Sequence, residues 1–284
     1  GADLFSTMNG YVQAPGGGSL SGVNEGAGIT LGTTIPGPYG ATNSRFCKVN
    51  EVGNPTRKSI LCGGKAGDGP VLGHKVRVEM GPNQSSAAIA ASGQTVWISE
   101  SLYIPASRFS SDTGAGNVLQ CHQSDGTVDP FGPFALVYYP AGAIAPNACL
   151  AIVSNRSVAP HTDHNVYHWI SDNGGGGPVP NWPKDQYADI VFKFRGDPPT
   201  NSGQIGGVGT GFLSVWLMGN LIVDAQNIKI GIYTPGFPNT YVKSGYDDFT
   251  PSGGTTGGYQ LYRAFEGFVD NANVTLAKIR ARLT

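Results

Sequence analysis

Three short segments of the chain carry residue types that can do acid–base chemistry on a charged substrate. The segments are Lys75-Val-Arg-Val-Glu-Met80, Gln120-Cys-His122 and Lys229-Ile-Gly-Ile-Tyr233. In a β-strand, residues two apart lie on the same face, so each segment presents polar side chains on one side and apolar ones on the other. If the apolar sides pack in the core, the polar residues Arg77, Gln120, His122, Lys229 and Tyr233 line one groove.

These residue types are the ones that β-elimination from a uronate-containing glycan needs. The proton at C5 of a uronate is weakly acidic, and it leaves readily only when the neighbouring carboxylate is neutralised. Arg77 can do this through its bidentate guanidinium, and Gln120 can donate an amide hydrogen bond. His122 or a deprotonated tyrosine can take the proton, and Tyr233 can protonate the departing glycosidic oxygen.

The same three segments resemble the signature strands of the alginate lyases of polysaccharide lyase family seven. Those enzymes carry an Arg-x-Glu-x-Arg strand, a Gln-Ile/Val-His strand and a Tyr-Phe-Lys-Ala-Gly-x-Tyr strand, in that order. Residues 182–233 are also similar to the heparin-lyase and glucuronan-lyase families, in which a Trp-x-x-Gly turn and a Gly-Ile-Tyr strand recur. The resemblance covers residues 70–283. It departs from the alginate lyases at Gly81, Asn227 and Thr234, which bears on the substrate more than on the chemistry.

The resemblance implies a role for each residue. Arg77 and Gln120 would hold the substrate carboxylate, while His122 would be the base and Tyr233 the acid or the sole acid/base. The expected substrate contacts are Lys75, Glu79, Lys229 and, as a further groove residue, His168. We therefore expect a polysaccharide lyase that cleaves an anionic polymer, such as alginate or glucuronan, and leaves a C4–C5 double bond.

Short β-rich segments separated by turn signals follow one another from about residue 71 onward. They are residues 75–80, 95–99, 101–105, 134–139, 150–153, 165–170, 188–194, 212–217, 227–233 and 274–279. Many short strands predict an all-β fold. We expect one domain over residues 1–284, a concanavalin-like β-jelly roll of two antiparallel sheets with a concave substrate groove. Residues 1–45, rich in Gly, Pro, Ser and Thr, should form a loop-rich wrap with an edge strand.

The composition narrows the class of partner. Charged residues make up 13% of the chain and the net charge is -1, so no general basic field exists to attract nucleic acid. No apolar run is long enough to span a membrane. We expect an anionic polysaccharide as the partner, a secreted location and no cofactor, although a structural calcium ion near Asp247 and Asp248 is an alternative to a polar turn there.

Four cysteines, Cys47, Cys62, Cys121 and Cys149, allow two interpretations. An even count in a glycine-rich chain favours disulfides, and a Cys47–Cys62 bridge would contribute about 3 kcal/mol by loop closure. A second bridge would join Cys121 to Cys149. The alternative is that all four are small buried hydrophobic residues.

Each candidate also has an ordinary explanation when taken alone. Arg77 and Glu79 are compatible with a cross-strand ion pair on a solvated sheet face. His122 and Tyr233 are compatible with ordinary strand positions, so the functional interpretation depends on all the segments occurring in one order. Trp216 could stack on a sugar or pack in the core. The cluster of His161, Asp163, His164 and His168 fits no standard zinc spacing and favours a loop followed by a strand.

Three other functions compete with a lyase. A non-catalytic carbohydrate-binding or lectin-like domain on the same fold would need aromatics and amides but no acid/base pair. A jelly-roll glycoside hydrolase would need two carboxylates, and the three segments supply only Glu79. A structural protein of a virion or cell surface would also tolerate the glycine-rich loops.

Overall fold

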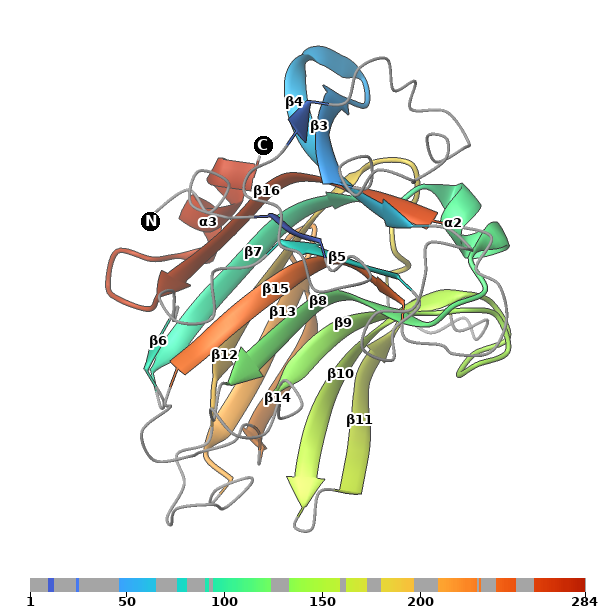
Figure 1. Ribbon diagram of the computed structural model, residues 1–284. Helices are drawn as coiled ribbons and strands as arrows, with labels where there is room; N and C mark the ends of the chain where they lie inside the picture. Colours follow the sequence, from blue (N-terminus) through green and yellow to red (C-terminus); the bar gives the residue numbers. More distant parts are fainter. Residues whose placement is uncertain are drawn as a thin grey trace.

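The computed structural model describes residues 10–12, 24–25, 46–64, 76–80, 90–91, 94–123, 133–158, 162–172, 180–196, 209–228, 230, 239–248 and 258–283. It describes the backbone and the strand pairing, without the side chains, for residues 10–12, 24–25, 46–48, 58, 64, 76–80, 90–91, 122–123, 155–158, 162–165, 239–241, 247–248 and 268. Over these ranges the chain is almost entirely β-structure, in two stacked sheets (Figure 1). The prediction of an all-β protein with two antiparallel sheets is therefore confirmed.

The sheets, here named sheet A and sheet B, contain most of the described residues. Sheet A has the order β1 (Gly10–Val12), β5 (Val76–Met80), β15 (Asn239–Asp248), β8 (Gly116–Gln123), β9 (Phe134–Tyr139), β10 (Cys149–Val158) and β11 (Thr162–Ile170), with β6 (Ala90–Ala91) also paired to β15. Sheet B has the order β14 (Asn220–Ile228), β13 (Gly211–Leu217), β12 (Tyr187–Arg195), β7 (Thr95–Tyr103), β16 (Gly258–Val269), β4 (Asn54–Gly64), β3 (Phe46–Glu51) and β2 (Asn24–Glu25). The pairings are antiparallel except for the short contact between β2 and β3.

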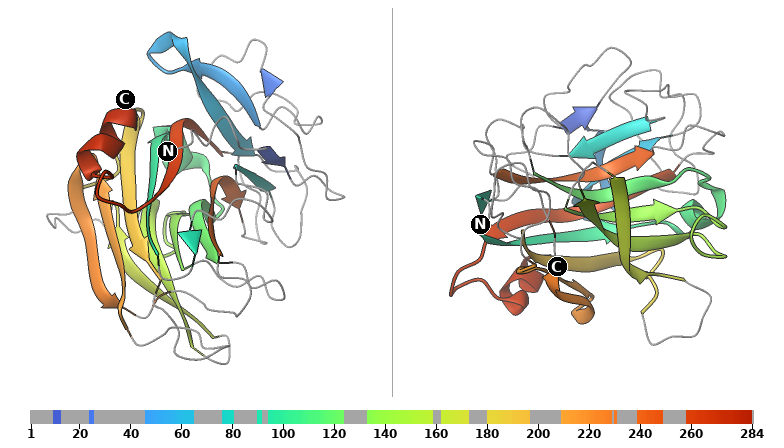
Figure 2. Two further views of the ribbon diagram at one scale, coloured as in Figure 1. Left: turned by 90° about the vertical axis from the view of Figure 1, so that its left-hand side faces the viewer. Right: turned by 90° about the horizontal axis from the view of Figure 1, so that it is seen from below.

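The core lies between the two sheets, which Figure 2 shows as adjacent layers in its left panel. The alternation of side chains along each strand explains this core. Every second residue points inward, and the fully buried cluster includes Ile98 and Leu102 of β7, Ile190 and Phe192 of β12 and Leu119 of β8. The predicted segments 95–99 and 101–105 merge into one continuous strand, β7. That strand carries the buried Glu100 into the core.

One predicted strand is a helix. Residues 274–279 were expected to form a strand, but α3 covers Leu276–Leu283 and packs on the outer face of sheet B. Leu276, Ile279 and Leu283 recur at helical spacing, and they contact Trp97 and Val191 in one cluster. The helical spacing of these apolar residues therefore determines the structure here, and the β-rich composition of residues 274–279 does not.

A second predicted strand is displaced. Residues 227–233 were expected to be extended, but β14 ends at Ile228, and Asn227 has a left-handed φ of 54°. Ile230 is buried as predicted, although outside any strand. Residues 229 and 231–238 lie outside the described residues.

The amino-terminal part contains a hairpin that the sequence pattern did not indicate. Strands β3 and β4 pair through a turn at Val52 and Gly53, where Gly53 has a φ of 79° that favours glycine. Figure 1 shows this hairpin projecting beyond the two layers. The edge strand expected in residues 1–45 is present as β1, which pairs with β5.

The predicted disulfides are not formed. Cys62, Cys121 and Cys149 are buried thiols, as the alternative interpretation expected. Cys47 lies opposite Leu61 in the pairing of β3 with β4, whereas Cys62 lies opposite Phe46. This register places the two cysteine positions on opposite faces of the hairpin, so no Cys47–Cys62 bridge can close there. Within the described ranges, no helix is long and apolar enough to cross a membrane.

Candidate functional site

Three strands of sheet A that carry polar candidates lie side by side, in the order β5, β15 and β8 (Figure 1). In the register of β15 with β8, Lys243 is opposite Gln120 and Tyr241 is opposite His122. In its register with β5, Asp247 is opposite Arg77 and Gly245 is opposite Glu79. The fold therefore brings the sequence positions of Arg77, Gln120 and His122 onto neighbouring strands.

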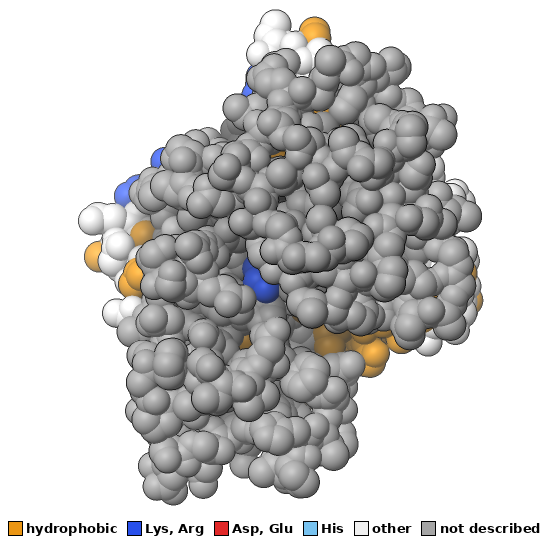
Figure 3. All heavy atoms as spheres, viewed as in Figure 1, with side chains coloured by type: hydrophobic (Ala, Val, Ile, Leu, Met, Phe, Trp, Pro, Cys, Tyr) orange, Lys and Arg blue, Asp and Glu red, His pale blue; other side chains and the backbone are white. Residues whose placement is uncertain are grey.

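Gln120 and Lys243 belong to the face of sheet A that is turned away from sheet B, here called the outer face. Their chain neighbours Leu119 and Val242 pack in the core, so alternation turns Gln120 and Lys243 outward. Each is only 8% exposed, which is low for polar residues on a sheet face. Figure 3 shows one Lys or Arg side chain near the middle of the view.

A β-bulge sets the position of Gln120. Asn117 pairs with Val137 and Leu119 pairs with Leu136, so Val118 is an extra residue in β8 relative to β9. The amide Nδ2 of Asn117 donates to Oε1 of Gln120 at 3.3 Å. In a regular strand, residues three apart point to opposite faces, so this hydrogen bond exists because the bulge adds one residue between them.

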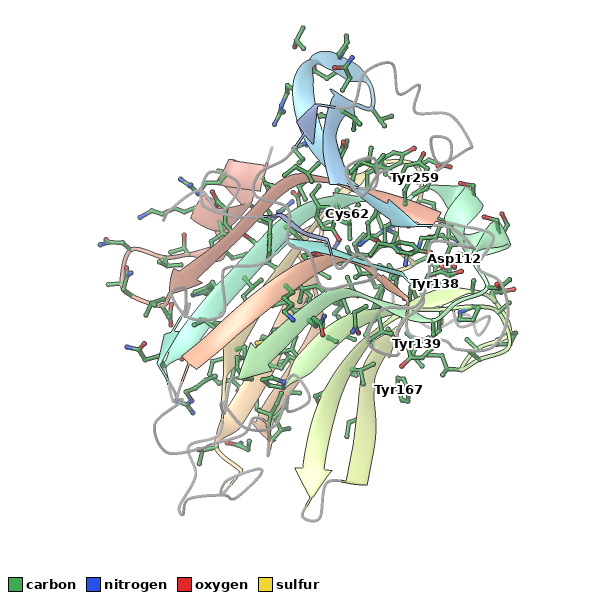
Figure 4. The ribbon with its side chains drawn as sticks, viewed as in Figure 1. Cys62, Asp112, Tyr138, Tyr139, Tyr167 and Tyr259 are labelled. Atoms are coloured by element: carbon green, nitrogen blue, oxygen red, sulfur yellow. The ribbon has the colours of Figure 1, made fainter. Side chains whose placement is uncertain are left out.

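The outer face becomes apolar on the other side of Gln120. A row of directly opposed residues runs from Gln120 through Ala135 of β9 and Val153 of β10 to Tyr167 of β11. Tyr167 is 41% exposed, and its ring contacts that of Tyr139 edge-on, with 6.0 Å between centroids (Figure 4). Burial raises the pKa of Tyr139 well above its ordinary value, so this hydroxyl stays protonated. The row can therefore contact both polar and apolar parts of a ligand.

Behind the same strands, on the core side, lies a buried carboxyl group. Glu100 of β7 is completely buried, and burial raises its pKa to about 8 against the weaker opposing effect of Ser244. Ser244 Oγ lies 2.7 Å from Glu100 Oε2 and 2.9 Å from the carbonyl oxygen of Val118. Ser244 therefore links the carboxyl group of Glu100 to the backbone carbonyl of Val118, the extra residue of the β8 bulge next to Gln120.

The polar contacts continue from Glu100's neighbours towards α2 (Ala106–Ser111). The hydroxyl of Tyr262 donates to the Val118 carbonyl at 3.2 Å, and the side-chain amide of Gln260 donates to Tyr262 and to the Gly245 carbonyl. Arg108 in turn donates to Gln260.

Arg108 is itself held by an acid and two aromatic rings. Its Nε donates to Asp112 Oδ2 at 3.2 Å, and its guanidinium lies over the rings of Tyr138 and Tyr246. Asp112 also accepts a hydrogen bond from the Tyr246 hydroxyl at 2.9 Å. Figure 4 shows Asp112 next to Tyr138, near the end of β9.

Apart from His168, the predicted site residues fall into three groups. Arg77, Glu79 and His122 have the expected strand positions, with only their backbones described. Lys75, Lys229 and Tyr233 lie outside the described residues, so their predicted roles stay predictions. Gln120 has the outward orientation that was expected.

His168 does not join Gln120. It lies on β11, three strand spacings from β8, or about 14 Å. Its Nε2 is 2.6 Å from Ser154 Oγ. Ser154 is buried, and it pairs with the core residue Phe134. His168 is therefore a residue of the far edge of sheet A.

Strand β15 is the part of the site that the sequence pattern missed, and it adds Tyr241 and Lys243. Its residues Tyr241-Val-Lys-Ser-Gly245 match the Tyr-Phe-Lys-Ala-Gly portion of the family pattern, so a signal was present in the sequence. The match fails at the tyrosine that ends the pattern, where this chain has Asp247. The preceding residue, Tyr246, points into the core and donates to Asp112. Tyr246 therefore cannot act on the outer face.

The described residues contain no group of three side chains suited to hold a metal ion. Of the polar cluster in residues 161–168, only His168 has a described side chain.

This arrangement of two sheets is the fold of the jelly-roll polysaccharide lyases. An alginate lyase from Pseudomonas aeruginosa superposes with a TM-score of 0.54 over 95% of this chain and 100% of its own, at 12% identity. The endo-β-1,4-glucuronan lyase from the fungus Trichoderma reesei gives a TM-score of 0.54 over 81% and 88%, at 11% identity. Alginate lyase A1-II′, a member of polysaccharide lyase family 7, gives 0.53 over 94% and 96%, at 12% identity. No protein-family model and no curated protein matches the sequence.

Proposed function

We propose that this protein is a polysaccharide lyase that cleaves a uronate-containing polymer by β-elimination. The observation that supports the proposal is the pairing of β5, β15 and β8. In it, Lys243 lies directly opposite Gln120 and Tyr241 opposite His122, while Arg77 lies opposite Asp247, on the other side of β15 and further along it. The fold is shared with alginate and glucuronan lyases. One lyase of this fold was solved in complex with substrate (GGMG) and with product (GGG), which supports a saccharide ligand for the fold.

In this proposal, cationic and amide groups neutralise the uronate carboxylate. Gln120 and Lys243 lie directly opposite one another and are largely withdrawn from water, so their interaction with a carboxylate is strengthened. Arg77 would supply a second cation from β5, from its position opposite Asp247, four residues along β15 from Lys243. Together these groups would stabilise the negative charge that develops when the C5 proton leaves.

Proton transfer requires a base and an acid near the glycosidic bond. His122 is the proposed base and Tyr233 the proposed acid, or Tyr233 serves as both. The register adds Tyr241 as a second candidate for the acid, because it lies opposite His122. Comparing Tyr233→Phe with Tyr241→Phe decides between the two tyrosines.

A non-catalytic carbohydrate-binding domain is the second candidate. The exposed ring of Tyr167 beside Tyr139 favours it, because aromatic faces stack on sugar rings in proteins that only bind. The two functions differ in outcome: a binding domain retains the polymer and leaves its length unchanged.

The test is incubation with alginate, glucuronan, heparinoids and pectin while the ultraviolet absorbance of the C4–C5 unsaturated product is recorded. We expect absorbance with at least one polymer and its near-complete loss in Gln120→Leu and Lys243→Met. Lys278→Met is the matched control, since Lys278 lies on α3 against the opposite sheet. Binding without absorbance across the panel would favour the second candidate, and new reducing ends without absorbance would contradict a lyase.

A further inference from the structure

One residue behind the candidate site lies outside the regular pairing of sheet A: Val118 of β8 has no directly opposed residue on either β15 or β9. Ser244 pairs with Leu119 and Asp247 pairs with Asn117, so Gly245 and Tyr246 on β15 oppose the single residue Val118 on β8. Such bulges leave backbone groups unpaired, and buried unpaired groups are costly. Here side chains contact the carbonyls at the bulge: Ser244 and Tyr262 donate to the Val118 carbonyl, and Gln260 donates to the Gly245 carbonyl.

The hydrogens available around Ser244 indicate the protonation state of Glu100. Ser244 has one hydroxyl hydrogen, yet its Oγ lies within hydrogen-bond distance of two acceptors, Glu100 Oε2 and the Val118 carbonyl oxygen. A protonated Glu100 removes the conflict, because it donates to Ser244 Oγ and leaves the serine hydrogen for Val118. An ionised Glu100 would take that hydrogen and leave the Val118 carbonyl with the Tyr262 hydroxyl as its donor.

No described cation compensates a charge on Glu100. Its Oε1 has no hydrogen-bond partner among the described residues. The titratable groups of the surrounding core are Tyr262 on β16, the thiols of Cys62 on β4 and Cys121 on β8, and the pair formed by Arg108 on α2 and Asp112 just after it. Arg108 is already engaged by Asp112 and Gln260. Burial as the main cause of the raised pKa of Glu100 agrees with a neutral acid.

We propose that Glu100 is a neutral acid in the folded protein, and that through Ser244 it is a positioning residue that holds the Val118 bulge beneath Asn117 and Gln120. The inference rests on the proposed function only for its effect on turnover. Glu100 touches neither substrate nor reacting atoms. Its contribution is the local backbone geometry that turns Gln120 outward beside Asn117 and Lys243.

The first experiment measures urea unfolding of the wild type and of Glu100→Gln between pH 5 and pH 9. A raised pKa in the folded state means that the wild type loses stability as pH rises from the ordinary carboxyl value of 4.5 to about 8, and is level above that. The amide introduced by the substitution cannot ionise, and it can donate to Ser244 throughout. The ratio of the folding constants, wild type over variant, should therefore fall about tenfold per pH unit in that window. Parallel curves would overturn the neutral-acid assignment.

The second experiment compares alanine substitutions of two buried serines, one beneath the candidate site and one at the far edge of sheet A. The comparison separates a positioning role from a general loss of stability. Ser244→Ala removes the donor to the Val118 carbonyl, while Ser171→Ala removes an acceptor for the Leu150 amide at the far edge. We expect Ser244→Ala to lower kcat at least tenfold with KM little changed, and Ser171→Ala to leave kcat unchanged. Glu100→Gln should retain kcat at pH 7 and lose less activity than the wild type above pH 8.

Equal kcat values for the two serine variants would overturn the positioning role. If the wild type itself shows no lyase activity on any polymer, the proposed function fails, and the unfolding curves still decide the state of Glu100. The two failures are therefore distinguishable.

Discussion

The two ends of the core between the sheets are built from different kinds of side chain. At one end, the ring of Phe134 on β9 packs on Phe192 and Phe194 of β12, with centroids 5.2 Å and 5.1 Å away. At the other end, beneath β15 and β8, Glu100 and Gln260 occupy the same kind of interior position. Both ends are sealed from water, so exposure does not explain the difference.

The two ends differ in the backbone geometry that their side chains must stabilise. Apolar packing stabilises the sheets without demanding particular directions, and it suffices where β9 and β12 are regular. Buried polar groups cost desolvation, which makes them a poor source of stability. They are found here where strands are bulged and carbonyls need directed donors. The polar end therefore supports the geometry of the candidate site, and the apolar end supports the fold.

The largest expected effect is on catalysis. Replacing the acid by phenylalanine removes one hydroxyl and keeps the ring, so Tyr233→Phe should lower kcat about 10²–10⁴-fold with little change in KM. Tyr241→Phe is the paired measurement. If Tyr241→Phe alone shows this loss, the acid is on β15, and if neither does, neither tyrosine transfers the proton.

Breaking the buried ion pair should cost stability and activity together. Arg108→Met leaves the Asp112 carboxylate buried without its cation, and such changes cost about 3–5 kcal/mol in free energy of unfolding. The same change releases Gln260, so kcat should fall too. The double variant Arg108→Met/Asp112→Asn should recover part of the stability, as measured by urea unfolding. A single variant as stable as the wild type would contradict this account of the polar end.

A cavity at the apolar end should cost stability alone. Phe192→Ala is expected to lower the free energy of unfolding by about 3–5 kcal/mol. At temperatures where the variant stays folded, its kcat should equal that of the wild type. A kcat loss as large as that of Arg108→Met would remove the distinction between the two ends.

The smallest effect is expected at α3, remote from both ends. Thr275 Oγ accepts a hydrogen bond from the Lys278 amide at 3.3 Å, which caps the helix. Thr275→Ala should cost about 1 kcal/mol in free energy of unfolding, with kcat unaffected. Thermal unfolding and product absorbance measured on the same sample check both parts.

Periodicity in the sequence predicts the sheets well where strands are regular and apolar on one face. The segments 134–139 and 188–194 coincide with or fall inside β9 and β12. It fails where two periods compete, as at residues 276–283, and where glycine interrupts alternation, as in β15. The β3–β4 hairpin was missed because its turn and the start of β4 are polar.

The candidate site was predicted in part for a similar reason. Gln120 and the strand positions of Arg77 and His122 follow from alternation along single strands. The position of the partner strand β15 could not be predicted in this way, because its bulge interrupts the alternation of polar and apolar residues that would have identified Lys243. Glu100 falls between two predicted segments, since a charged residue is unexpected in a core. Its place becomes visible only when Ser244 and Val118 are brought next to it.

The most direct test of a lyase is the fate of water during cleavage. A uronate polymer that gives product absorbance is digested in water enriched in ¹⁸O, and the oligosaccharides are analysed by mass spectrometry. β-Elimination predicts products one water lighter than hydrolysis products, with no ¹⁸O beyond the level that finished products, made in ordinary water, take up at their reducing ends during the same incubation. Products of hydrolytic mass that carry one ¹⁸O per cleaved bond would contradict the account and identify a hydrolase on the same fold.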